Sequence, residues 1–279
     1  MTRIVFASDL DRTLIYPART LPVGSDAFVV EYYNGRGVSV AAPATIRALR
    51  ELACHDAFVP VTTRSRLQLE RIAPVWSIAR HGWAICANGF TLLDRGVEDR
   101  GWKAIVDAGC AESASLDEAR GVFEREIGSP ETVGWMHSLR DCDDRFLFTT
   151  IARTHAPPDL ESIATQALAP LHWRAVWHGR KLYALPAALG KAPAAAYLRE
   201  RLDIDVLMSA GDSVLDIALM ESADVSWCPR DAEIVALDRV PERAIVTDLP
   251  HVGAAQQIAE SALDLVREGA PGDVDAAAT

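Results

Sequence analysis

The sequence has little of what a disulfide-stabilised, zinc-binding or membrane-spanning protein requires. Its 279 residues include only five cysteines, which are scattered, odd in number and never arranged as CxxC. This usage argues against a disulfide framework or a zinc site and favours reduced thiols in a cytoplasm. The apolar run after Met1 is too short for a signal peptide, and no stretch of about 18 apolar residues is present to span a membrane. We therefore expect a soluble, cytoplasmic protein.

Positive charge is also scarce. Lysine and arginine number 28 against 39 aspartate and glutamate residues, giving a net charge of −11. This balance disfavours non-specific binding to nucleic acid or to an anionic membrane, although it allows a local basic pocket. The chain exceeds the ~100–200 residues of a typical domain, so we expect one large domain or two smaller ones. The sequence does not indicate the oligomeric state.

Strand-like and helix-like segments alternate at both ends of the chain. Short apolar runs predict buried strands at residues 4–8, 58–61, 83–87, 206–210, 225–228 and 244–246. Helical spacing is found at residues 43–52, 66–75, 191–202, 216–222 and 252–267. Asn34-Gly35 between β-rich runs predicts a hairpin over residues 28–40. The alternation predicts an α/β fold with a Rossmann-like, doubly wound parallel sheet.

The middle of the chain has a different pattern, in which a helix-like segment is followed by two strand-like runs. This unit occurs twice, first at 114–127, 131–137 and 145–152, and then at 158–170, 172–178 and 181–185. The repeated order predicts an inserted α+β cap domain with a duplicated plan.

The expected domain organisation follows from these two patterns. Residues 1–89 and 188–267 are assigned to the Rossmann-like core domain, residues 90–187 to the α+β cap domain, and residues 268–279 to a disordered tail that is rich in glycine, aspartate and alanine.

Polar residues follow three of the predicted core strands. Asp9-Leu-Asp11 comes after the first strand, Thr62-Thr-Arg64 after the second, and Gly211-Asp212 after a later one. In a parallel α/β sheet, ligands bind beyond the carboxyl ends of the strands. We therefore expect these three segments, which are distant in sequence, to form one site.

The acids at this edge point to a divalent cation. Asp9, Asp11, Asp212 and Asp216 would repel one another unless a proton or a cation intervened. Oxygen ligands without histidine or cysteine favour Mg²⁺ over Zn²⁺. A carboxylate beside a metal-bound phosphate can act as a nucleophile, and Thr62 and Lys191 are candidates to bind the transferring phosphoryl group.

Four motifs resemble those of the haloacid dehalogenase (HAD) superfamily. Asp9-Leu-Asp-Arg-Thr13 resembles its DxDGT signature, and Val59-Pro-Val-Thr62 resembles a strand ending in Thr or Ser. Gly190-Lys191 resembles the third motif and Gly211-Asp-Ser-Val-Leu-Asp216 the fourth, GDxxxD. The order and spacing fit over roughly residues 1–265. Thr62–Ser65 together with Ile85–Gly89 is similar to the Cof-type and sugar-phosphate phosphatase branch, whose cap contains two αββ units.

The resemblance implies a role for each matching position. Asp9 would be the nucleophile and a Mg²⁺ ligand, and Asp11 would be the general acid/base and bind Mg²⁺ through its carbonyl group. Thr62 and Lys191 would hold the phosphate, Asp212 would be a metal ligand, and Asp216 would support the metal shell. The remaining substrate-binding candidates are Thr63, Arg64 and Asn88. Arg64 is also compatible with an ordinary surface charge on a helix.

The expected activity is Mg²⁺-dependent hydrolysis of a small phosphate monoester, with a sugar phosphate as the expected substrate class, through an aspartyl-phosphate. Two alternatives remain open, a phosphohexomutase of the same superfamily and a non-catalytic protein that binds a phosphorylated metabolite. The sequence departs from the motifs at three positions: Arg12 and Thr63 stand where glycine is usual, and Leu215 where asparagine is frequent. Of these departures, Arg12 and Leu215 motivate the second alternative.

The predicted cap holds the residues that would select the leaving group. Six polar or aromatic side chains lie in its predicted strands and form either the cap core or a substrate contact: Trp135, His137, Trp173, Trp177, His178 and Arg180. The acidic run Asp141–Asp144 lacks the rest of a calcium-binding loop and is interpreted as a turn.

Overall fold

The computed structural model describes residues 2–269, which divide into two compact units. The core unit comprises Met1–Asp99 and Lys191–Thr279, and the cap unit comprises Arg100–Gly190. The sequence-based boundaries lay between residues 89 and 90 and between residues 187 and 188. In the structure, residues 90–99 belong instead to the core unit, because two short strands there pair with a strand of that unit. Of the tail expected at 268–279, Glu268 ends a helix, and residues 270–279 lie outside the described part of the chain.

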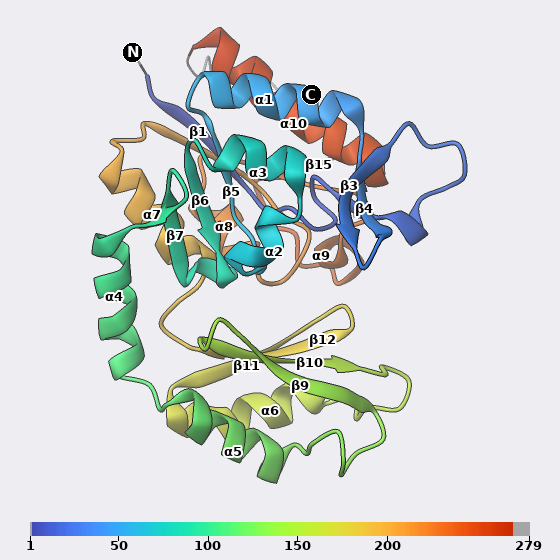
Figure 1. Ribbon diagram of the computed structural model, residues 1–279, viewed down its shortest axis with the longest axis vertical. Coiled ribbons are helices and arrows are strands. Elements are labelled where there is room, and N and C mark those ends of the chain that lie inside the picture. The colour runs from blue at the N-terminus through green and yellow to red at the C-terminus, as the bar shows by residue number, and fades with distance from the viewer. Residues whose placement is uncertain (1, 270–279) are drawn as a thin grey trace. The chain divides into compact units, whose positions relative to one another are not determined.

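The core unit contains a five-stranded parallel sheet (Figure 1), and this confirms the predicted α/β fold. Its order is β15 (Ala244–Val246), β14 (Val225–Cys228), β13 (Val206–Ala210), β1 (Ile4–Ser8) and β5 (Phe58–Pro60). All five residues of β1 are buried, as expected for a central strand that helices cover on both faces. The strand order reverses at β1, which is where doubly wound sheets bind ligands.

One further strand extends this arrangement beyond β5. β6 (Trp83–Cys86) is parallel to the chain after β5 through a bridge between Val61 and Ile85. It continues into the antiparallel strands β7 (Thr91–Asp94) and β8 (Val97–Glu98). The 3-10 turn η2 (Ala87–Gly89) joins β6 to β7 and carries Asn88.

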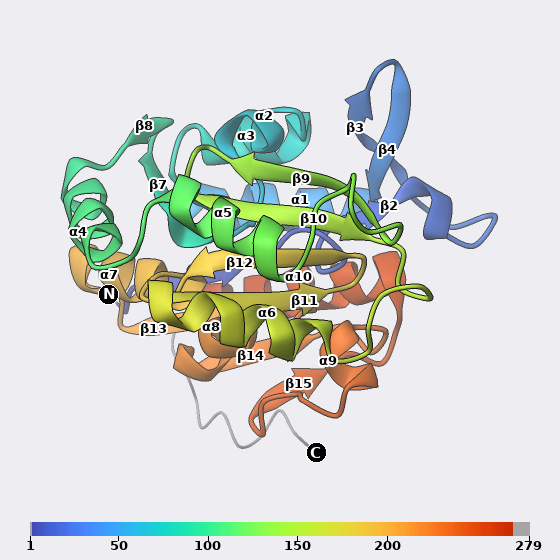
Figure 2. The ribbon, with the colours of Figure 1, turned by 90° about the horizontal axis from the view of Figure 1, so that it is seen from below.

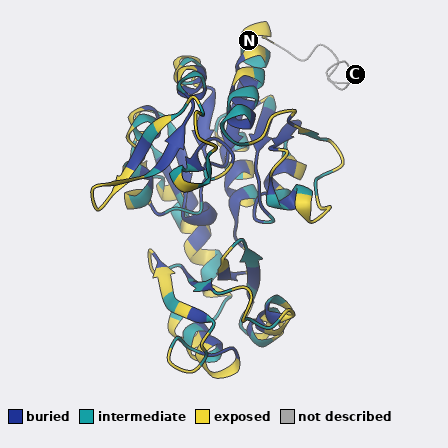
Figure 3. Cartoon of the chain, turned by 90° about the vertical axis from the view of Figure 1, so that its right-hand side faces the viewer, coloured by how far each residue is buried: buried dark blue, intermediate teal, exposed yellow. Residues whose placement is uncertain are grey.

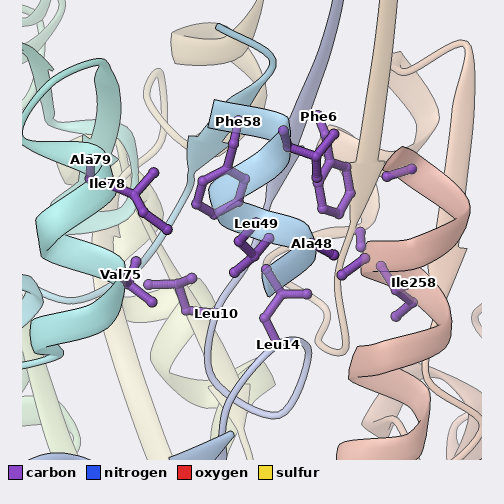
Figure 4. Close-up of a cluster of buried hydrophobic side chains, with 14 of the residues drawn as sticks. Phe6, Leu10, Leu14, Ala48, Leu49, Phe58, Val75, Ile78, Ala79 and Ile258 are labelled. Carbon is purple, nitrogen blue, oxygen red and sulfur yellow. The ribbon is translucent and has the colours of Figure 1, made fainter. Parts of the chain in front are cut away.

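Helices supply the apolar faces that bury the sheet. They are α1 (Pro43–Cys54), α2 (Arg66–Glu70), α3 (Ala73–Ala79), α7 (Lys191–Arg201), α8 (Ile217–Ser222), α9 (Glu233–Ala236) and α10 (His251–Glu268). Figure 4 shows Phe6, Leu49, Phe58, Val75 and Ile258 meeting from β1, α1, β5, α3 and α10. Full burial of one such side chain stabilises the folded state by about 1.5–3 kcal/mol. The packing of this cluster therefore holds in place the strands whose ends carry the polar residues.

A small antiparallel sheet precedes α1 in the core unit. It has the order β2 (Tyr16–Pro17), β4 (Arg36–Ala41) and β3 (Phe28–Tyr33), and the 3-10 turn η1 (Ala18–Thr20) follows β2. Asn34 and Gly35 have φ values of 50° and 73°, the left-handed conformation that a tight two-residue hairpin turn requires. The hairpin predicted over residues 28–40 is therefore present.

The cap unit is an α+β domain with the repeated plan expected from the sequence. Its helices are α4 (Arg100–Ala111), α5 (Leu116–Glu126) and α6 (Leu160–Leu168), followed by the short turn η3 (Ala169–Leu171). Its antiparallel sheet has the order β11 (Trp173–His178), β12 (Lys181–Pro186), β10 (Phe146–Ile151) and β9 (Met136–Cys142). Within this unit, α5 and α6 cover one face of the sheet (Figure 2).

One expectation for the cap is wrong and another is met in part. The strand expected at 131–137 is instead β9, at Met136–Cys142, because Thr132 bonds back to Ser129 in a turn (Thr132 Oγ1 accepts from the Ser129 backbone N–H at 2.8 Å). The turn expected at Asp141–Asp144 is shorter than expected: Asp141 and Cys142 are in β9, while Asp143 and Asp144 form the hairpin turn with φ values of 51° and 55°. Helix α4 was not predicted at all.

Most strands of the parallel sheet in the core unit are buried, as the dark blue strands in Figure 3 show, whereas β9 of the cap unit is buried only at its two ends. Trp173 is 3% exposed, and its Nε1 donates to the Ala114 carbonyl at 2.9 Å, so it belongs to the cap core. Among residues 2–269, none of the helices is both long and apolar enough to cross a membrane.

Candidate active site

The carboxyl ends of β1, β5 and β13 form the edge on which the site is built. The Asp9 backbone N–H donates to Ala210 at the end of β13 at 2.9 Å. On the other side, the Val61 N–H donates to Ser8 at the end of β1 at 2.7 Å. Asp9 therefore lies between the chain segments that carry Thr62 and Asp212, as the strand-end pattern predicted.

Four buried side chains meet at this edge. Lys191 is the first residue of α7, and its Nζ lies 2.6 Å from Asp9 Oδ1 and 2.5 Å from Asp216 Oδ1. Asp9, Asp212 and Asp216 each offer a carboxylate oxygen, and these oxygens lie within 4.8 Å of one another. None of the three acids is more than 5% exposed. We call Asp9, Asp212 and Asp216 the aspartate cluster; Lys191 is the one cation that forms an ion pair with it in the described chain.

Backbone and hydroxyl donors orient two of the three carboxylates. Thr13 Oγ1 donates to Asp9 Oδ2 at 3.0 Å. The Ser213 N–H and Oγ donate to Asp216 Oδ2 at 3.0 and 2.6 Å. A Cβ at Gly211 would lie 2.2 Å from the Asp216 Cβ, so only glycine allows this turn to close. Thr13 and Ser213 were not among the expected site residues, although both lie inside the quoted motifs.

The proton affinities of the cluster reflect its burial. Burial raises the pKa of Asp9 to about 7; Lys191 opposes this, but the charges of Asp216 and Asp11 add to it. Burial, followed by the charges of Asp9 and Asp216, raises the pKa of Asp212 well above its usual value. For Lys191, burial acts to lower the pKa, but the two contacting carboxylates raise it overall, so the ammonium stays charged. The cluster thus holds more negative charge than one lysine neutralises.

The donor set suits a magnesium ion. Within residues 2–269, no side chain or backbone group donates a hydrogen bond to the Asp212 carboxylate, although Asp212 is only 2% exposed. A buried carboxylate without a partner is costly, and a divalent cation with oxygen ligands would satisfy it. Both oxygens of Asp216 already accept hydrogen bonds, from Lys191 and Ser213, so this residue is suited to supporting the other ligands.

The phosphate-binding candidates lie on the segment after β5 and on η2. Thr62 is fully buried, and its Oγ1 accepts from the Arg64 N–H at 3.1 Å. The Asn88 N–H donates to the Thr62 carbonyl at 2.9 Å, with Asn88 in a left-handed conformation (φ 56°). The side-chain nitrogen and oxygen of Asn88 are both buried and have no partner in the described chain. Thr63 is half-buried between Thr62 and Arg64.

Arg64 and Asp11 form a second group, apart from the aspartate cluster. Arg64 Nε and Nη2 lie 2.6 and 2.8 Å from the two oxygens of Asp11. Its Nη1 lies 2.9 Å from Glu31, a buried acid of β3 that also contacts Arg71 at 3.1 Å. We call Asp11, Glu31, Arg64 and Arg71 the arginine clamp. The interpretation of Arg64 as a surface charge is excluded by these contacts.

Two functional candidates were missed from the sequence. Glu31 gave one signal, because it is the single acid in the apolar run Phe28–Tyr33. Tyr16 gave none: it is 2% exposed, its hydroxyl has no partner in the described chain, and its ring packs edge-on to His251 at 5.8 Å. Burial, then the charges of Asp231 and Asp212, raise the pKa of Tyr16, so it stays a neutral donor beside the cluster.

The departures from the motifs have structural consequences. Arg12 has φ 63°, a conformation that glycine adopts without strain, and its exposed charge acts to lower the pKa of Asp212. Leu215 is 8% exposed and adds an apolar side chain between Ser213 and Asp216. Neither change removes a member of the aspartate cluster.

No protein-family model matches the sequence, and no curated protein sequence matches it either. Solved structures do share its fold. The sucrose-phosphatase of Synechocystis sp. PCC6803, solved with sucrose and phosphate, is 15% identical with a TM-score of 0.65. That match covers 95% of this chain and 99% of the phosphatase.

Two other phosphatases show the same likeness. BT1666 from Bacteroides thetaiotaomicron, a phosphatase of the haloalkanoate (HAD) enzyme superfamily, is 16% identical with a TM-score of 0.54, and the match covers 96% of both chains. The C-terminal domain of trehalose-6-phosphate phosphatase from C. albicans is 14% identical with a TM-score of 0.52, covering 94% of this chain and 92% of that one. The resemblance found in the motifs is therefore confirmed at the level of the fold: this chain has the fold of the HAD-superfamily phosphatases.

Proposed function

We propose that the chain is a Mg²⁺-dependent phosphatase of the HAD superfamily that hydrolyses a small phosphate monoester, with a sugar phosphate as the substrate class. The observation that carries this proposal is the buried aspartate cluster with Lys191. Three buried carboxylates and one ammonium group hold more negative than positive charge, and a divalent cation would compensate this excess while also binding a phosphate. In a purely structural core, burial of these charged groups would cost free energy without a compensating interaction.

The residues divide into metal-binding and phosphate-binding groups. Asp9 and Asp212 would hold the ion, with the Asp11 carbonyl as a further ligand and Asp216 supporting them. The ion would neutralise phosphate charge so that an anionic carboxylate can approach phosphorus. Lys191, the Thr62 hydroxyl and the free amide of Asn88 would bind the phosphoryl oxygens.

The proposed reaction has two displacements. Asp9 attacks phosphorus, and the bond from phosphorus to the ester oxygen breaks as that oxygen takes a proton from the Asp11 carboxyl group. Water then attacks the aspartyl-phosphate and gives its proton to the Asp11 carboxylate, and the bond between Asp9 and phosphorus breaks. Asp11 ends as it began, and the products are an alcohol and inorganic phosphate.

The cap sheet offers residues for recognising the leaving group. Phe148 and Tyr183 are cross-strand partners, and Lys181 Nζ lies 5.3 and 5.8 Å from their ring centroids. Their neighbour Leu147 is on the opposite face, together with Asp141, whose carboxylate pairs with Arg120 of α5. The two rings and the cation are thus on the face without helices, where the half-buried Phe148 ring and the exposed Lys181 are suited to a sugar ring that carries hydroxyl or anionic groups, and the buried Tyr183 ring supports them.

The test is a panel of phosphorylated metabolites incubated with the full chain and Mg²⁺, with release of inorganic phosphate as the readout. We expect turnover of sugar phosphates that is absent in chelator and in Asp9→Asn. Isomerised sugar phosphate without phosphate release would favour the phosphohexomutase alternative. Binding without any turnover would leave only the non-catalytic alternative. The cytoplasmic location expected from cysteine usage stays a prediction.

A second arm tests the cap residues. We expect Lys181→Ala to raise KM for a sugar phosphate several-fold and to leave KM for p-nitrophenyl phosphate nearly unchanged, because the small aryl ester has no group for the cation to contact. Lys103→Ala, on the exposed side of α4, is the matched control within the same unit.

A further inference from the structure

Glu31 owes its buried position to an irregularity in the hairpin of the core unit. Val29 pairs with Val40 and Glu31 pairs with Ser39, so Val30 is an extra residue on β3 at this point. A bulge of this kind redirects the side chains that follow it. As a result, Val30 and Glu31 are consecutive and both buried, at 3% and 2% exposure. The bulge therefore buries an acidic side chain on a strand whose C-terminal end is exposed to solvent.

The Glu31 carboxylate is held by three donors from three segments. Ser39 of β4 donates through Oγ to Oε2 at 2.6 Å. Arg64 and Arg71 donate to Oε1 at 2.9 and 3.1 Å, from the loop after β5 and the end of α2. Burial acts to raise the pKa of Glu31, but the hydrogen bonds from these three donors lower it overall. Glu31 is therefore a fixed negative charge.

This charge sets the direction of the Arg64 guanidinium. The group is planar, and its Nε–Nη2 edge faces the Asp11 carboxylate in a two-point contact at 2.6 and 2.8 Å. Its third nitrogen, Nη1, points to Glu31. Because the plane is rigid, fixing Nη1 at Glu31 fixes the edge that meets Asp11.

The consequence is a separation of carboxylates. Asp11 is two residues from Asp9, yet its carboxylate is not one of the three that share the aspartate cluster. Without Arg64 in place, a flexible aspartate so close in sequence would be free to turn toward a bound cation.

We propose that Glu31 is a positioning residue for Asp11. Acting through Arg64, it holds the Asp11 carboxylate apart from the aspartate cluster, so that the carboxylate can move from the guanidinium to the leaving group instead of binding the cation. The inference rests on the proposed function, because it takes Asp11 as the proton carrier. It differs from a purely structural role, in which Glu31 would only attach the hairpin to α2.

The first test compares two esters in the presence of Mg²⁺, using Glu31→Gln in the full chain. Hydrolysis of p-nitrophenyl phosphate needs little protonation of its leaving group, whereas an alkyl ester such as glycerol phosphate needs it fully. We expect kcat for the alkyl ester to fall about 10-fold or more, and kcat for the aryl ester to change less than about threefold, because general acid catalysis contributes about 10²–10⁴-fold.

Two further variants extend and control this comparison. Arg64→Lys keeps the charge but loses the two-point contact, so we expect it to show the same selective loss. Glu70→Gln removes a carboxylate of α2 that pairs with Arg66 and, within residues 2–269, forms no hydrogen bond or ion pair with a side chain of the arginine clamp, so both rates should stay at the wild-type value. An equal loss on both esters in Glu31→Gln would show a structural role and overturn the proposal.

The second test does not depend on turnover. Calorimetric titration with Mg²⁺ alone should show about tenfold tighter binding in Glu31→Gln, because a released Asp11 adds a carboxylate near the cation. The double variant Glu31→Gln with Asp11→Asn should lose this gain. If the wild type hydrolyses neither ester, the proposed function fails, and the titration alone decides the positioning: unchanged Mg²⁺ affinity in Glu31→Gln overturns it, and a gain that Asp11→Asn removes supports it.

Discussion

The two charged groups of the core unit include Asp9 and Asp11, which are two residues apart in sequence, but the groups differ in how their charges balance. The aspartate cluster has three buried carboxylates, and two of them, those of Asp9 and Asp216, contact the one ammonium group, that of Lys191. The arginine clamp has two carboxylates and two guanidinium groups, joined by hydrogen bonds. The aspartate cluster therefore has more negative than positive groups, whereas the arginine clamp has equal numbers of both.

This difference separates ligand binding from positioning. Burial raises the pKa of both Asp9 and Asp212, which means that the folded protein makes the ionised form of these carboxylates less favourable. Burial has the same tendency at Glu31, but there the donors outweigh it and the pKa is lowered. A cation should therefore act strongly on the aspartate cluster and weakly on the clamp, and each prediction below tests that contrast.

The largest effect should come from Asp9→Asn. An amide cannot attack phosphorus, so we expect kcat to fall about 10⁴-fold or more, equivalent to at least about 5.5 kcal/mol of activation free energy. The folded state should be as stable as the wild type or more stable, because the amide removes one charge from an over-negative cluster. Phosphate release and urea unfolding measure the two quantities, and retained activity would exclude Asp9 as the nucleophile.

Removal of the single ammonium group of the aspartate cluster should lower the stability of the fold. In Lys191→Met, Asp9 and Asp216 lose their contacts at 2.6 and 2.5 Å and remain buried. We expect the free energy of unfolding to fall by about 3–5 kcal/mol, the cost of leaving buried charge unpaired. Lys103→Met is the matched control, because its pair with Asp107 is on the surface and should contribute less than about 1 kcal/mol. Equal urea midpoints for the two variants would contradict the contrast.

Much of the core unit could be predicted from the sequence, because parallel strands at the centre of a sheet are continuous apolar runs. Ile4–Ser8 and Val206–Ala210 are such runs, and the acids that follow them give the position of the site. The hairpin turn at Asn34-Gly35 was equally clear. These features depend on local sequence, so local reasoning was sufficient.

The parts that were missed depend on contacts between distant residues. Glu31 became a site residue only because a bulge turns it toward Arg64, 33 positions later in the chain. Arg64 itself was assigned to the substrate, since no sequence pattern indicated a carboxylate partner. In the cap, β9 has a polar sequence, Met136–Cys142, with weak strand preference, and its pairing with β10 places it.

Addition of Mg²⁺ should stabilise the aspartate cluster. At 100 times its dissociation constant, a ligand that binds only the folded state adds about 2.7 kcal/mol to the free energy of unfolding. We expect this gain for the wild type in thermal and urea unfolding, and a much smaller gain for Asp212→Asn, whose carboxylate has no other partner in the described chain. Glu70→Gln should keep the full gain. No change of stability with Mg²⁺ would argue against the metal site.

The smallest effect, and the one that compares the two groups most directly, is the pH dependence of the metal-free protein. Asp9 has a pKa of about 7 when folded and 3.8 as the ordinary value, so between these limits the folded state binds more protons than the unfolded state. Stability must then fall as pH rises, by about 1.4 kcal/mol between pH 6 and pH 8 for one such group. Asp9→Asn and saturating Mg²⁺ should each flatten this slope. Glu31→Gln should leave it unchanged, because the lowered pKa of Glu31 puts its own titration below this pH range. A slope that stays at the wild-type value in Asp9→Asn would show that the titration of Asp9 does not control stability near neutral pH.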